Sequence, residues 1–306
     1  MIQLLDYRKI SLSLSATLFA LSILAMVFFG LNVGIDFTGG SLLEVEFTSS
    51  RPAVEEVYGA LKPLDLGGVV AQPVGDQNMI MKMRYIDETQ HQQILGVLRD
   101  TFAQDGINTV LERRLDTIGP SVGEQLRNRA LYAGVAVLLA ILGYIAFAFR
   151  GVSRPIPSWQ YGGAAIIALV HDVVITMGVF AVLGHYFGVE LDIAFVVAML
   201  TVLGYSVNDT IVVFDRIREN LLHDGPRQFT QTVNNGIKET LVRSINTGMA
   251  TLISLTALFV LGGDSIRYFS LALIIGIILG TYSSIFVASA LLVVWNEHMI
   301  KKESKV

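Results

Sequence analysis

The chain has 306 residues, of which 53% are apolar and 16% are charged, and its formal net charge is −4. This composition is typical of a membrane protein and excludes an ordinary soluble domain of the same length. The weak net charge provides no basic surface for nucleic acid. Because the sequence contains no cysteine, disulfides, thiolate metal sites and cysteine nucleophiles are also excluded.

Six segments are long and apolar enough to cross a bilayer as helices, which requires about 20 residues each. They lie at about Ile10–Leu31, Ala130–Phe149, Tyr161–Leu183, Leu191–Val213, Ser244–Gly262 and Tyr268–Trp295. The first could instead be a cleaved signal peptide, but its apolar stretch is long and no small-x-small cleavage site follows it. We therefore predict a polytopic α-helical membrane protein with six transmembrane helices, the first within residues 1–31.

The positions of Lys and Arg predict that both termini are cytoplasmic, because cytoplasmic loops carry an excess of these residues. In that orientation the inner side receives Arg8, Lys9, Arg150, Arg154, Arg216, Arg218, Arg227, Lys238, Arg243, Lys301, Lys302 and Lys305. The two short outer loops contain only Arg267. The segment 130–306 is then a five-helix transmembrane region that ends in a short basic tail.

Residues 32–129 differ in character and predict an extracytoplasmic domain. Strands are expected at about 41–47, 69–74, 79–86 and 108–118, and a helix at about 52–61. A second, amphipathic helix should begin after Asp87 as N-cap, with Ile94, Leu95, Val97, Leu98 and Phe102 on its apolar side. The order β-α-β-β-α-β is that of a ferredoxin-like α+β fold, which supports many functions.

Two further patterns lie close to the membrane. The segment Asp36-Phe37-Thr38-Gly39-Gly40 predicts a turn in which Asp36 and Thr38 bond nearby backbone and the glycines adopt positive φ. At about residues 226–241, apolar side chains recur every four residues at Phe229, Val233, Ile237 and Leu241. This spacing predicts an amphipathic cytoplasmic helix that lies along the membrane surface or against the bundle.

The most informative polar residues interrupt the fourth span, where Asn208 and Asp209 stand in an apolar run. An ionisable group in hydrocarbon costs about 2.5–3.5 kcal/mol on insertion scales and by default marks a pathway for ions or protons. Arg243 opens the fifth span at a similar depth, so an Asp209–Arg243 pair is geometrically feasible. Alternatively, Arg243 is a membrane anchor and Asp209 a hydrogen-bonding group between helices.

Other polar residues in the spans allow two or more interpretations. Asn208, Asn246 and Thr247 either surround that pair or hydrogen-bond neighbouring helices. His171 and Asp172, near the middle of the third span, either neutralise each other or conduct protons. Gly276 and Gly280 form a small-xxx-small face that indicates close helix packing.

The sequence has no Walker lysine motif, no His/carboxylate metal cluster and no nucleophilic triad. We therefore expect no enzyme activity of its own, no nucleotide hydrolysis, no metal and no other cofactor. An ion gradient is the remaining source of energy.

Four motifs in the same order resemble the SecD/SecF family of bacterial protein-export membrane proteins, and within it the SecF type. They are DFTGG at 36–40, HDV at 171–173, GYSVNDTIVVFDRIREN at 204–220 and RSINT at 243–247. The resemblance covers nearly the whole chain. It implies membership of the resistance-nodulation-division superfamily and a SecD partner that completes a twelve-span unit in the bacterial inner membrane.

The resemblance further implies association with the SecYEG channel and a YidC-type insertase, and contact with lipid and the translocating preprotein. Proton-motive force would drive late, SecA-independent stages of export. Asp209 and Arg243 match the family's membrane charges tied to proton flow, with supporting roles for Asn208, Asn246, Thr247, His171 and Asp172. Asp36, Gly39 and Gly40 match a signature turn that acts as a hinge.

Two alternatives to the export motor remain open. The first is a stand-alone proton-coupled exporter of small molecules, which would require a homodimer to supply twelve spans. The second is a passive assembly factor that holds channel components together and needs no titrating group.

Overall fold

The computed structural model describes residues 4–103, 109–150, 155–224 and 228–303. The chain divides into two compact units, a helical unit of Met1–Asn32 with Tyr132–Val306 and a smaller unit of Val33–Leu131.

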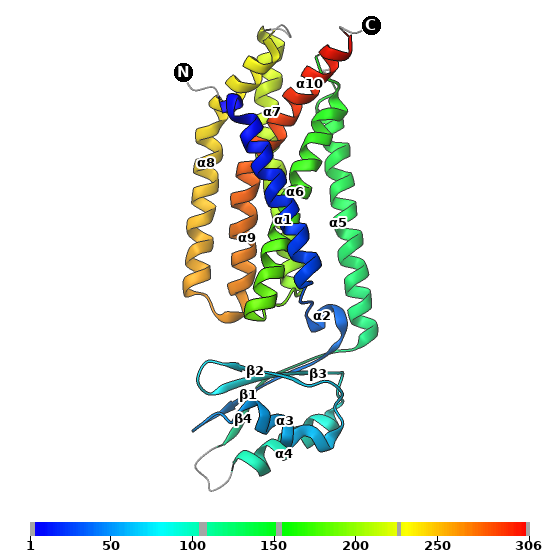
Figure 1. Cartoon of the computed structure of the whole chain (residues 1–306), viewed down its shortest axis with the longest axis vertical. Helices are drawn as coiled ribbons and strands as arrows, with labels where there is room; N and C mark the ends of the chain where they lie inside the picture. Colours follow the sequence, from blue (N-terminus) through cyan, green and yellow to red (C-terminus); the bar gives the residue numbers. More distant parts are fainter. Residues whose placement is uncertain (1–3, 104–108, 151–154, 225–227, 304–306) are drawn as a thin grey trace. The chain divides into compact units, whose positions relative to one another are not determined.

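The smaller unit contains a four-stranded antiparallel sheet in the order β2-β3-β1-β4. Its elements are α2 (Ile35–Thr38), β1 (Gly40–Phe47), α3 (Val54–Leu61), η2 (Lys62–Leu64), β2 (Val70–Val74), β3 (Asn78–Met83), α4 (Glu88–Phe102) and β4 (Val110–Ile118). Figure 1 shows α3 and α4 on one face of the sheet. The predicted ferredoxin-like α+β fold is confirmed.

Period-two alternation on the strands builds the core of this unit. Leu43, Val45 and Phe47 of β1 are fully buried, and every second residue of β3 is buried as well. The apolar faces of α3 and α4 cover these side chains. Asp87 caps α4 as expected, because its Oδ1 accepts a hydrogen bond of 2.8 Å from the backbone N–H of Gln90.

Within the described part of the chain, six helical segments are long and apolar enough to cross a membrane, and all lie in the helical unit except Pro120–Ala148, which begins in the smaller unit. Their elements are η1 (Leu4–Tyr7), α1 (Arg8–Phe29), α5 (Pro120–Ala148), α6 (Ser158–Phe187), α7 (Ile193–Asp224), α8 (Phe229–Leu261), α9 (Asp264–Ser283), the π-helical η5 (Ser284–Ala288) and α10 (Ser289–Glu303). The last three elements form one span. The prediction of a six-span membrane protein is confirmed.

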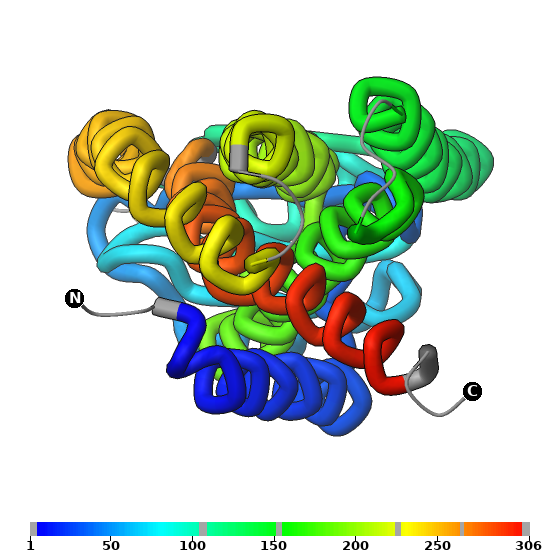
Figure 2. The backbone as a smooth tube through the Cα atoms, turned by 90° about the horizontal axis from the view of Figure 1, so that it is seen from above, coloured from blue at the N-terminus to red at the C-terminus, as the bar shows by residue number. Residues whose placement is uncertain are grey.

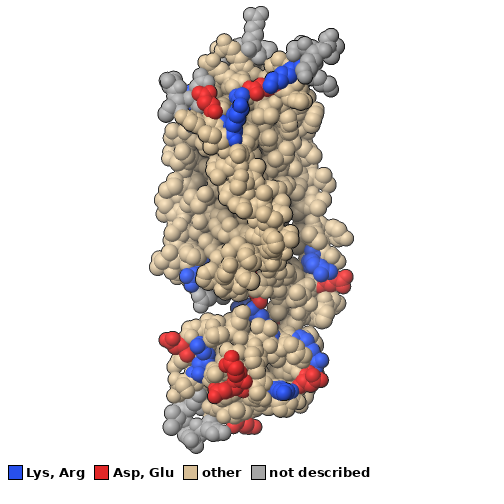
Figure 3. Space-filling model, in the orientation of Figure 1, with Lys and Arg blue, Asp and Glu red and all other residues tan. Residues whose placement is uncertain are grey.

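Figure 2 shows α1, α5 and α8 at the periphery of the helical unit, around α6, α7 and α9. In the most apolar windows of the three peripheral spans only 11%, 6% and 17% of residues are buried. On the face shown in Figure 3, the described Lys, Arg, Asp and Glu side chains leave a broad band of the helical unit uncharged. This band is the surface expected to face lipid or the helices of another membrane protein.

The amphipathic helix expected at about 226–241 is not a separate element. From Phe229, α8 continues without interruption to Leu261, whereas residues 225–227 lie outside the described part. Because Lys238–Arg243 contains neither proline nor glycine, nothing in this stretch ends the helical hydrogen bonding. Phe229, Val233 and Ile237 are buried in the core of the bundle, so this face packs against helices rather than along a membrane surface.

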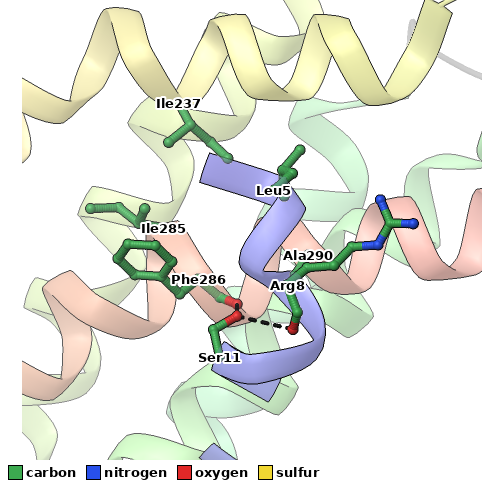
Figure 4. A pocket seen from close by; sticks show the side chains of 7 residues that line it. All are labelled: Leu5, Arg8, Ser11, Ile237, Ile285, Phe286 and Ala290. Carbon is green, nitrogen blue, oxygen red and sulfur yellow. Dashed lines mark hydrogen bonds between the residues drawn. The ribbon is translucent and has the colours of Figure 1, made fainter. Parts of the chain in front are cut away.

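The buried residues by which helix α1 contacts the bundle are serines. They are Ser11, Ser15 and Ser22. Figure 4 shows Ser11 beside Phe286 of η5, whose backbone carbonyl accepts a 3.3 Å hydrogen bond from Ser11 Oγ. Ser15 Oγ lies 3.1 Å from the hydroxyl of Tyr282. Small polar residues of this kind allow helices to approach closely in a bilayer.

Candidate functional site

The core of the helical unit contains a buried polar cluster centred on Asp172 of α6, a residue with no exposed surface. Its Oδ2 accepts hydrogen bonds of 2.7 Å from Ser206 Oγ of α7 and from Ser283 Oγ of α9. Its Oδ1 lies 3.0 Å from Nδ1 of His171. The predicted pairing of His171 with Asp172 is therefore present, and two further helices join it.

Asp209 lies about one helical turn along α7 from Ser206, and only 9% of its surface is exposed. Its Oδ2 makes no hydrogen bond within the described residues, and neither does the buried hydroxyl of Ser244. The polar side chains near its carboxyl group are those of Ser244, Ser284 and Arg243. A buried carboxyl oxygen without a partner is costly and marks a position where a proton or another group can bind.

Arg243 lies at a depth similar to that of Asp209. The residue is 18 positions before the end of α8, or about 27 Å at 1.5 Å per residue, whereas Asp209 is 16 positions after the start of α7, or about 24 Å. Both helix ends lie on the same side, because the α7–α8 connection joins the other two. No direct ion pair joins Asp209 and Arg243 among the described residues, and Arg243 is exposed, so their pairing stays a prediction.

Asn208, Asn246 and Thr247 form no hydrogen bond with Asp209 among the described residues, so their supporting role stays a prediction. All three are exposed, and their side chains form no hydrogen bond with another described residue. Together with Arg243 they give α7 and α8 a polar exposed face at membrane depth. Polar residues in a span normally face a bundle interior or a water-filled cavity.

The Asp36–Gly40 segment forms a tight connection that requires glycine. Thr38 Oγ1 donates to the carbonyl of Gly34 at 3.1 Å, so the predicted side-chain bond to nearby backbone is confirmed for Thr38. Gly39 and Gly40 have φ of 71° and 139°. A Cβ at Gly39 would lie 2.7 Å from Cα of Pro120, so both the backbone angle and the space demand glycine.

Several members of the polar cluster were not anticipated from the sequence. Ser206, Ser283, Ser284 and Thr210 are fully buried, and Thr210 Oγ1 lies 3.0 Å from Ser284 Oγ. Serine and threonine are common in membrane helices, so their presence alone identifies no site. The one available signal was spacing, because Ser206 and Thr210 lie four residues apart and therefore share a helix face with Asp209 nearby.

No group of three or more His, Asp or Glu residues suited to holding a metal ion occurs among residues 4–103, 109–150, 155–224 and 228–303. The cluster is a set of hydroxyl, imidazole and carboxyl groups that can each donate or accept hydrogen bonds.

The family model for the protein export membrane protein SecD/SecF, C-terminal, matches residues 99–298, and the SecD/SecF GG motif matches residues 24–50. The chain belongs to the SecD/SecF family. Among its relatives, the protein translocase subunit SecF of Thermobaculum terrenum is 42% identical over 97% of this chain and 94% of the relative. SecF of Haemophilus influenzae is 36% identical over 97% of this chain and 88% of the relative.

The chain is also similar to solved SecDF structures. SecDF of Thermus thermophilus, described as a translocon-associated membrane protein, matches with a TM-score of 0.81 at 32% identity and covers 97% of this chain. SecDF in a super-membrane-facing form matches with a TM-score of 0.70 at 34% identity. The SecD/SecF chain described here spans only 39% and 40% of those two chains, whereas it matches the SecF relatives over nearly their full length.

Proposed function

We propose that this membrane protein is the SecF-type subunit of a bacterial protein-export translocase and uses the proton-motive force to promote late, SecA-independent stages of preprotein translocation. The observation that carries the proposal is Asp209, a buried carboxyl group at membrane depth with one oxygen unpartnered. A proton that binds there from one side of the membrane and leaves to the other changes the charge in the bundle core. The energy of the gradient then drives a conformational change.

Arg243 is the proposed counter-charge. It lies near Asp209, and no ion pair joins the two side chains within the described residues. When Asp209 is ionised, the guanidinium group moves toward the carboxylate and lowers the cost of its burial. When Asp209 is protonated, that attraction is lost and the two helices separate. The glycine connection at Asp36–Gly40 is the proposed hinge that carries this movement into the smaller unit.

The proposed partner is a SecD-type protein. Solved SecDF chains are more than twice as long as this chain, which supports a second component of comparable size. The exposed polar groups of Arg243, Asn246 and Thr247 support the same conclusion, because they are costly in lipid and are satisfied when another protein's helices cover them. SecYEG, a YidC-type insertase and the preprotein are proposed as further contacts, with both termini of this subunit on the cytoplasmic side of the inner membrane.

The test is replacement of Asp209 by Asn, which keeps the shape and removes the titrating group. Inverted membrane vesicles that contain the variant with its partner are loaded with a translocation intermediate and given an imposed proton or sodium gradient. We expect Asp209→Asn to abolish the gradient-driven part of translocation. The matched control is Asp215→Asn, an exposed carboxylate on the same helix that pairs with Arg218.

Undiminished gradient-driven translocation in Asp209→Asn vesicles, at wild-type protein levels, would refute the proposal. If only an imposed sodium gradient drives translocation, the coupling ion is sodium rather than the proton. The double variant Asp209→Asn/Arg243→Gln tests the passive assembly role. That role requires translocation by the double variant to equal that of wild type. Purification in mild detergent tests the exporter role, which requires a homodimer rather than a complex with a second six-span protein.

A further inference from the structure

Asp172 is a second buried carboxyl group that the Asp209 mechanism leaves unused. It lies 14 residues from one end of α6 and 15 from the other, so about 21 Å of helix extends on either side. This is the most expensive depth for a charge. The one charged or titratable side chain that acts on it within the described residues is His171, since α7 and α9 present only hydroxyl groups.

The contacts of Asp172 suit two protonation states equally well. When the carboxylate is ionised, the hydroxyls of Ser206 and Ser283 both donate to its Oδ2. When it is protonated on Oδ1, the new O–H donates to Nδ1 of His171, and both hydroxyls still donate to Oδ2. No hydrogen bond is lost in either state. A carboxylate held in place by a cation would instead lose its ion pair on protonation.

His171 provides a chemically complete way to load the site. Its Nδ1 is 3.0 Å from Oδ1 of Asp172, and its buried Nε2 has no hydrogen-bond partner within the described residues. When Nε2 takes up a proton, the ring is an imidazolium ion that releases the Nδ1 proton to Oδ1. The ring is then neutral with its proton on Nε2, the carboxyl group is protonated, and the charge is balanced.

The serines that donate to Asp172 lie beside residues of the Asp209 site. Ser283, which donates to Asp172, is followed directly by Ser284, which lies near Asp209. On α7, Thr210 Oγ1 donates to the carbonyl of Ser206 at 3.0 Å and lies 3.0 Å from Ser284 Oγ. The residues that surround the two carboxyl groups are therefore neighbours on α7 and on the last span.

The π-helical turn η5 begins at this connection. It starts at Ser284 and follows α9 without a break, so the π-turn begins between the Asp172 site and the Asp209 site. Single π-turns in α-helices are frequent at functional sites. An irregular helical segment therefore begins next to both carboxyl groups.

We propose that Asp172 is a second proton-binding residue of this subunit, loaded through His171 and stabilised by the hydroxyl groups of Ser206 and Ser283. The inference rests on the proposed function, because the gradient is what moves protons through both sites. It adds a protonation step on α6 and a set of positioning hydroxyls on α7 and α9.

The first experiment is infrared spectroscopy of the purified full chain in lipid vesicles during an acid titration, in which the C=O absorption of protonated carboxyl groups is followed. We expect Asp172→Asn to remove one titrating component and Ser283→Ala to shift its midpoint. The matched control is Ser270→Ala, a fully buried serine on the same helix that donates only to the carbonyl of Ile266. Coincident titrations for wild type and Asp172→Asn, or for Ser283→Ala and Ser270→Ala, would overturn the inference.

The second experiment compares gradient-driven translocation in vesicles that carry Asp172→Asn or Asp209→Asn. Loss in both variants, with thermal unfolding like that of wild type, is the expected result. If only Asp209→Asn loses gradient-driven translocation, Asp172 is not a second proton-binding residue, but the proposed function stands. If both variants keep gradient-driven translocation, the second site and the proposed function are both rejected. If Asp172→Asn does not accumulate, Ser206→Ala and Ser283→Ala retain the carboxyl group and decide the same question by their infrared midpoints.

Discussion

The packing of α7 against α9 depends on the absence of a side chain at Gly276. A Cβ at this position would lie 2.2 Å from Cγ2 and 2.7 Å from Cγ1 of Val202. Favourable carbon–carbon contacts are about 3.5–4.0 Å, and Val202 is fully buried, so it has no free space to turn into. Overpacking of this kind typically costs about 1–3 kcal/mol.

The control for Gly276→Ala is Gly204→Ala on α7, where an added Cβ meets nothing within 4 Å. Both changes gain about 1 kcal/mol of helix propensity, so this contribution cancels between them. The free energy of unfolding should therefore be lower in Gly276→Ala than in Gly204→Ala by about 1–3 kcal/mol. The assay is reversible unfolding of the purified protein in mixed detergent micelles. Equal stability of the two alanine variants would refute the packing argument.

Two smaller predictions concern single groups. Asp87→Ala removes the cap of α4 and should lower the stability of that helix by about 1 kcal/mol, measured by hydrogen exchange of its first-turn amides, with exposed Asp76→Ala as the control. A loss of protection no greater than in Asp76→Ala would contradict the capping role. Tyr161→Phe removes a buried hydroxyl that has no partner within the described residues, while its ring still stacks on Phe149 at 5.3 Å. It should leave the unfolding free energy unchanged or raise it by up to about 1 kcal/mol, and a clear loss in the same micelle assay would indicate an undetected hydrogen bond.

The fold of the smaller unit was largely predictable because its signals are local. Alternation at Leu43, Val45 and Phe47 specifies a strand with one buried face, and an aspartate before an amphipathic run specifies a helix start. The sheet order then follows from the β-α-β-β-α-β sequence of elements. The start of the fifth span was harder to predict. An amphipathic stretch followed by an apolar one suggests two separate helices, although no proline or glycine separates them here.

The sequence by itself determined the number of spans and the residues able to carry charge in the membrane, since length, apolarity and residue type are properties of a single segment. Only the tertiary structure decided which polar groups meet. Asn208 and Asp209 are adjacent in the chain but about 100° apart around α7, so one is exposed and the other is buried. The packing of α6, α7 and α9 then brought Ser206 and Ser283 to Asp172 from 34 and 111 residues away in the chain. No local pattern encodes such a meeting, because it depends on how each helix is rotated against its neighbours.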